Sequence, residues 1–99
     1  MKTILKIESE IDNSTIKNII DEALNHEKAK LEFSILKATK KLKIYENKYH
    51  AKSQNLGKSI FAEDLIGQDQ EYVEWYGEYS FLLKTVERIN TINNIEYAY

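Results

Sequence analysis

The feature that most constrains the fold is a pair of apolar stripes, each with the spacing of a helix packed along another helix. Their members recur every three or four residues, which keeps them on one helical face. The first stripe is Leu31, Ile35, Ala38, Leu42, Tyr45 and Tyr49, and the second is Tyr72, Trp75, Tyr79, Leu82, Val86 and Ile89. Since the chain has no proline, only glycine and loop residues can interrupt its helices. The stripes predict a long antiparallel helical hairpin that resembles a coiled coil.

The residues between and around the stripes set the expected bounds within a single domain, 1–99. The expected elements are a strand at 2–8, a long helix at 15–52, a loop with a short helical turn at 53–68, a second helix at 70–91 and a strand at 95–99. Asp12, Asn13 and Ser14 are all possible N-cap residues of the first helix, and Ser14 is the expected one; Asp69 is the expected N-cap of the second helix. The expected fold class is therefore mainly α, in β-α-α-β order. The two strands pair either with each other or with those of a second subunit.

Three details refine this hairpin. Glu27 and Lys28 fall on the first stripe. Charges there indicate either that the second helix does not reach so far, the interpretation that we prefer, or that the strand end of the molecule docks at this level. Gly77 lies inside the second helix, where a glycine often permits a close helix approach. In the loop, apolar residues around Phe61 predict a helical turn that places this ring inside the hairpin tip, before a stop at Gly67.

A second, thinner apolar line lies off the main stripe of the long helix. It consists of Phe33, Leu36 and Ile44. A helix that buries two sides needs two partners. We therefore expect this line to be a partner or dimer surface, and the chain to be a homodimer.

Charge is distributed unequally between the two halves of the hairpin. Residues 28–58 hold nine lysines and two glutamates, whereas residues 63–78 hold six acidic residues and no base. In an antiparallel hairpin these segments compensate each other, which favours that pairing. A second interpretation is a basic face for nucleic acid, formed by Lys37, Lys40, Lys41, Lys43 and Lys48. None of these is an arginine, the residue that leads in bidentate phosphate binding.

Aromatic residues gather where the hairpin is expected to close. They are Tyr45, Tyr49, Phe61, Tyr72, Trp75, Tyr76 and Tyr79. The cluster predicts a small aromatic core with hydroxyl groups at its rim. Because tyrosine and tryptophan also dominate protein interfaces, a role in partner binding stays open beside the structural one.

No pattern in the chain indicates catalysis. There is no cysteine, and His26 and His50 are about 36 Å apart along one helix by its rise. No carboxylate pair has a histidine or nucleophile at a telling spacing, and no glycine-rich phosphate loop occurs. We expect no enzymatic activity, no metal and no cofactor. With no long apolar run and no apolar leader, we expect a cytoplasmic protein that does not enter a membrane.

One set of motifs resembles a known family. Tyr45, Glu46, Lys48 and Tyr49, then a loop with Phe61 and Leu65, then Gly67 and a run from Asp69 to Trp75, are similar to a pattern in short helical proteins of archaeal and cyanobacterial type. Residues 50–57 depart from that pattern. Proteins of this family are regarded as antitoxins of toxin–antitoxin pairs. The resemblance implies a chain that binds and neutralises a partner encoded by an adjacent gene, with no catalytic residues.

Three functions therefore remain open from the sequence. The first is a protein-binding, antitoxin-like module that acts through a helical dimer surface. The second is a nucleic-acid-binding helical dimer that uses the lysine-rich face. The third is a structural coiled-coil element that associates only with itself.

Overall fold

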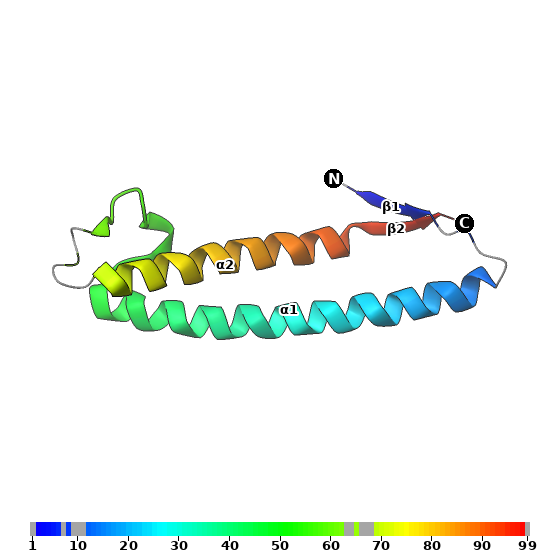
Figure 1. The fold of residues 1–99 in the computed structure, drawn as a ribbon, viewed down its shortest axis with the longest axis horizontal. Coiled ribbons are helices and arrows are strands. Elements are labelled where there is room, and N and C mark those ends of the chain that lie inside the picture. Colours follow the sequence, from blue (N-terminus) through cyan, green and yellow to red (C-terminus); the bar gives the residue numbers. More distant parts are fainter. Residues whose placement is uncertain (1, 7, 9–11, 63–64, 66–68, 99) are drawn as a thin grey trace.

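The structure is a computed structural model that describes residues 2–6, 8, 12–62, 65 and 69–98. Its elements are strand β1 (Thr3–Lys6), helix α1 (Asn13–Tyr49), the short 3-10 helix η1 (Ser53–Asn55), helix α2 (Asp69–Asn93) and strand β2 (Ile95–Ala98). The two long helices lie antiparallel along most of the molecule (Figure 1). The expected fold class, a mainly α helical hairpin with short terminal strands, is confirmed.

The two strands pair with each other. They form a parallel two-stranded sheet in which Thr3 lies opposite Ile95 and Lys6 lies opposite Ala98. In Figure 1, β2 continues the direction of α2, and β1 runs beside it in the same direction, opposite to that of α1. The whole hairpin is thus the connection between the two strands. Of the two pairings that the sequence left open, the structure has the one within the chain.

Helix α1 begins earlier than the sequence pattern indicated. Its N-cap is Asp12, whose carboxylate accepts a hydrogen bond from the backbone N–H of Ser14, so the prediction of Ser14 as N-cap was wrong. An aspartate two residues earlier satisfies an unpaired N–H of the first turn equally well. At the other end, His50 adopts a left-handed conformation with φ of 50° and donates its N–H to the carbonyl of Glu46.

Helix α2 extends further along α1 than expected. Arg88 Nη2 lies 3.6 Å from Glu27 Oε1, and Ile92 and Asn93 border a small hollow together with Leu24. The prediction that α2 stops short of Glu27 was therefore wrong, because a cation from α2 compensates this charge at the helix contact. Gly77 gives no close approach either, since nothing lies within 4 Å of the position that a Cβ would take.

The core is concentrated at the hairpin tip. Its buried members are Leu42, Leu56, Leu65 and Trp75, and the aromatic rings of α1 and α2 pack around them. The loop contributes two of these four residues. Phe61, in contrast, is 43% exposed, so the prediction that this ring lies inside the tip was wrong. Aliphatic side chains fill the space between the two helices and the loop instead. The predicted stop at Gly67 lies outside the described residues.

A hydrogen-bonded loop closes the tip. The carbonyl of Asn55 accepts the N–H groups of three residues, 58, 59 and 60, each at 3.0 Å. Gly57 has φ of 76°, and a Cβ there would come within 3.0 Å of the Tyr76 ring. This is the position where the fold requires a glycine, both for its backbone conformation and for its close approach to an aromatic ring.

The molecule is elongated. Its principal extents are 63 × 22 × 17 Å and its radius of gyration is 19.2 Å. A compact domain of the same length has a radius of gyration of about 13 Å. Such a shape buries one face of each helix and leaves the other faces in solvent.

Candidate functional site

The side chains with the strongest contacts meet at the hairpin tip, around Trp75. The indole is fully buried, and its N–H donates a 2.8 Å hydrogen bond to the Ser53 hydroxyl. The rings of Tyr45 and Tyr49 stack on it with centroid distances of 5.8 and 5.6 Å. Because both tyrosines lie one turn apart on α1, the indole of α2 contacts two successive turns of its neighbour. This arrangement fixes the register of the two helices.

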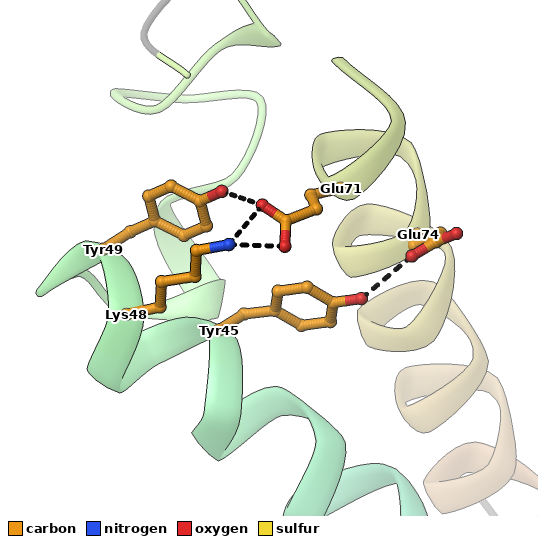
Figure 2. Close-up of polar contacts among 5 residues, drawn as sticks. All are labelled: Tyr45, Lys48, Tyr49, Glu71 and Glu74. Carbon is orange, nitrogen blue, oxygen red and sulfur yellow. Dashed lines mark hydrogen bonds and ion pairs between the residues drawn. The ribbon is translucent and has the colours of Figure 1, made fainter. Parts of the chain in front are cut away.

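A polar network joins the same two helices at the rim of this core (Figure 2). Lys48 Nζ lies 2.6 and 2.8 Å from the two carboxylate oxygens of Glu71, and the Tyr49 hydroxyl donates to the same carboxylate. The Tyr45 hydroxyl donates to Glu74 at 3.1 Å. Glu71 and Glu74 of α2 are thus each held by a donor from α1. The predicted compensation between basic and acidic segments takes this form.

The pKa shifts in this network follow from the same contacts. Hydrogen bonds from Lys48 and Tyr49 lower the pKa of the Glu71 carboxyl. The bond to Glu71 in turn raises the pKa of Lys48 and that of Tyr49. Burial, followed by the bond to Glu74, raises the pKa of Tyr45. Every shift favours the state already present at neutral pH, so the network is a stable link between helices.

The sequence reasoning missed part of this tip. Glu46 of α1 accepts a 2.9 Å hydrogen bond from the backbone N–H of Ser53, which holds the loop against the end of the helix. Tyr72 donates to the carbonyl of Ile60 at 3.1 Å. No spacing in the sequence marks a carboxylate that accepts from a loop N–H seven residues later. Of the predicted aromatic cluster, five rings belong to this core, whereas Tyr76 and Phe61 are 41% and 43% exposed.

A second site is an open groove along one side of the hairpin. It consists of two hollows of about 290 and 400 Å³ that share Lys41 and Glu78. We call this surface the groove; its lining residues are Ser34, Lys37, Lys41, Ile44 and Tyr45 of α1 and Glu71, Glu74, Glu78 and Phe81 of α2. Its α1 side carries lysines and its α2 side carries glutamates. The groove therefore has a basic edge and an acidic edge, with apolar side chains between the charges.

The predicted apolar line of α1 lies in solvent. Phe33, Leu36 and Ile44 are each more than half exposed. Ile44 lines the groove. The Nζ atom of Lys37 lies 5.6 Å from the centre of the Phe33 ring. Neither Phe33 nor Leu36 is among the residues that line the groove.

The predicted basic face divides into two groups. Lys41 and Lys48 lie 3.9 and 2.6 Å from Glu78 and Glu71, so acidic residues of the same hairpin already compensate them. Lys37, Lys40 and Lys43 are exposed on α1. The lysines therefore do not form one continuous uncompensated surface.

The histidines do not meet, and His50 caps the end of α1. In the part of the chain that the structure describes, no group of three or more histidine, cysteine or acidic residues is placed to hold a metal ion. Across the same residues, every helix is too short or too polar to traverse a bilayer. Comparison with protein-family models, with curated proteins and with solved structures finds no match to this chain. The fold and its surfaces define the class, a mainly α helical hairpin.

Proposed function

We propose that this chain is a non-enzymatic, antitoxin-like module that binds and neutralises a partner protein through a helical surface. The observation that carries the proposal is the solvent exposure of Phe33, Leu36 and Ile44 along one helix. These positions span 12 residues, about 16 Å along α1. Apolar side chains gathered on one surface commonly mark a protein-binding site.

The charges around this line indicate the chemistry of the partner. Lys37, Lys40 and Lys43 lie on the same stretch of α1 and are exposed. An amphipathic segment with apolar anchors and acidic residues beside them complements this surface in both respects. The hairpin tip is the weaker candidate for a binding surface, because its polar groups already form hydrogen bonds between the two helices. This contrast favours the exposed apolar line of α1.

Binding of nucleic acid by the lysines is the less supported function. Glutamates of α2 compensate two of the five lysines, and nucleic acid has to compete with those intramolecular pairs. If the lysine face binds nucleic acid, affinity falls steeply with salt and is lost in the double variant Lys40→Glu/Lys41→Glu.

Co-expression with the product of an adjacent gene tests the proposal. We expect a stoichiometric complex and relief of any growth inhibition caused by that product. Leu36→Glu should weaken the complex at least about tenfold, because it places a carboxylate in the apolar line. Leu83→Glu is the matched control, since Leu83 is 52% exposed on the other helix. Absence of a complex with the wild-type chain, or equal loss in both variants, contradicts the proposal.

A further inference from the structure

We propose that the groove binds a second copy of this chain, with the two hairpin tips at the same end of the dimer. The inference rests on the proposed function, in which exposed apolar side chains of the hairpin bind protein. It identifies a second copy of this chain as one such protein. Three observations carry it: the excess surface of the chain, the position of Phe81, and the opposite charges of the two groove edges.

The chain exposes more surface than a compact protein of its mass. Its accessible surface is 7445 Å² at 11.6 kDa. A compact monomer of this mass exposes about 5,800 Å². The excess of about 1,600 Å² is about twice the roughly 800 Å² that each partner buries in a standard protein interface. The elongated hairpin therefore has enough surface for a stable dimer without any change of fold.

Phe81 is placed to act as an anchor. It is 48% exposed and lines the groove together with Ser34, Lys37 and Lys41 of α1. The contacts of Lys41 with Glu78 and of Lys48 with Glu71 fix the register of the helices, and in this register Phe81 lies level with Ala38. This level is halfway between Phe33 and Ile44.

The charges of the groove select one of two symmetric arrangements. In a face-to-face dimer, the two-fold axis lies either along the hairpins or across them. An axis across the hairpins places α1 on α1, so that Lys37 and Lys41 face the same lysines of the second copy. An axis along the hairpins places α1 of each copy on α2 of the other at the same level, so that Lys41 faces Glu78 and Tyr45 faces Glu74 of the second copy.

The second arrangement also satisfies the apolar groups. Because it keeps the two copies at the same level, Phe81 of each copy meets α1 of the other between Phe33 and Ile44. The Phe81 ring of each copy then packs into the groove of the other copy. Leu36 lies outside this contact and stays accessible to another partner.

Light scattering over a range of concentrations tests the dimer. We expect a mass of twice 11.6 kDa for the wild type. Phe81→Glu should raise the dissociation constant at least about tenfold, because it places a carboxylate at the centre of the contact. Leu83→Glu, an equally exposed position on the other side of α2, should leave it unchanged. A wild-type monomer at every concentration, or equal effects of both variants, overturns the inference.

A distance measurement tests the arrangement without altering the groove. Since the chain has no cysteine, Asn18→Cys provides a single labelling site, and Asn18 is exposed on α1, far from the tip. In the proposed dimer the two labels lie within about 30 Å of each other. In the opposite arrangement each label lies about 32 Å from the groove centre by the helical rise, on opposite sides of it, so the labels are about 65 Å apart. The longer distance overturns the proposed orientation.

These results are separable from those for the proposed function. A monomer that still captures the product of the adjacent gene retains the proposed function and refutes the dimer. A dimer with the expected distance that captures nothing retains the dimer and refutes the antitoxin-like role.

Discussion

Replacement of Trp75 by alanine tests how far the tip holds the hairpin together. The indole is fully buried, stacks on two tyrosines and donates its N–H to Ser53. A buried tryptophan removes about 150–250 Å² from water, which at 25 cal/mol per Å² gives an upper bound of about 4–6 kcal/mol. Removal of the indole also leaves the buried hydroxyl of Ser53 without this donor. We expect Trp75→Ala to lower the free energy of unfolding by about 3–5 kcal/mol.

Thermal unfolding followed by circular dichroism, at one fixed protein concentration, provides the measurement. For a domain of this size, 1 kcal/mol corresponds to about 4–8 °C, so Tm should fall by at least about 12 °C. Val73→Ala is the matched control, because Val73 lies two residues away on the same helix and is 64% exposed. Its change should stay within about 0.5 kcal/mol.

A small effect at Trp75 would refute this reasoning. If Trp75→Ala unfolds within about 1 kcal/mol of the wild type, the tip is not the main source of stability. Trp75→Phe distinguishes the two contributions of the indole. It keeps an aromatic ring for the stack but loses the N–H, and should cost about 1–3 kcal/mol.

Four further changes test the loop, the middle of α2, the helix start and the polar network. Gly57→Ala should destabilise the fold by about 1–2 kcal/mol in chemical denaturation, because φ is 76° and the added Cβ would lie 3.0 Å from Tyr76. Gly77→Ala, which has open space around the added Cβ, should instead stabilise the fold by about 0.5–1 kcal/mol. Asp12→Ala should lower Tm by an amount equivalent to about 1 kcal/mol, because the first turn loses its cap. The pKa of Glu71 is lowered in the fold, so its contribution is present above its ordinary pKa of 4.5 and is lost as pH falls through the folded pKa. Unfolding measured from neutral pH to below 4.5 should therefore show a weaker pH dependence in Glu71→Gln than in the wild type.

The hairpin could be predicted because its signal is periodic and repeated. Apolar residues at helical spacing in two segments, without proline, determine two long helices, and opposite charges indicate how they pair. The aromatic cluster around Trp75 could be predicted for the same reason, since its tyrosines belong to the two stripes. These features depend on many residues, so no single contact decides them.

The errors concern single contacts across the fold. Glu27 looked like the end of the helix contact because its partner, Arg88, is 61 positions away in the chain. Phe61 and the buried loop residue Leu65 are both apolar, and only the closed loop decides which of them points inward. The groove could not be predicted for the same reason, since it exists only once the register places Phe81 beside Lys37.

The distribution of burial explains why the functional proposals concern surfaces. From Asn13 to Lys37, no described residue of α1 is buried, and the buried positions begin at Ala38. At the far end, a two-stranded sheet of four residues per strand carries Ile4, which is largely exposed, and such a sheet contributes little stability alone. The tip therefore supplies most of the buried contacts that hold the hairpin together. In the middle of the molecule, apolar side chains stay exposed in the single chain. A second copy on the groove would place Phe81 against that stretch, which links the uneven core of one chain to the dimer that we propose.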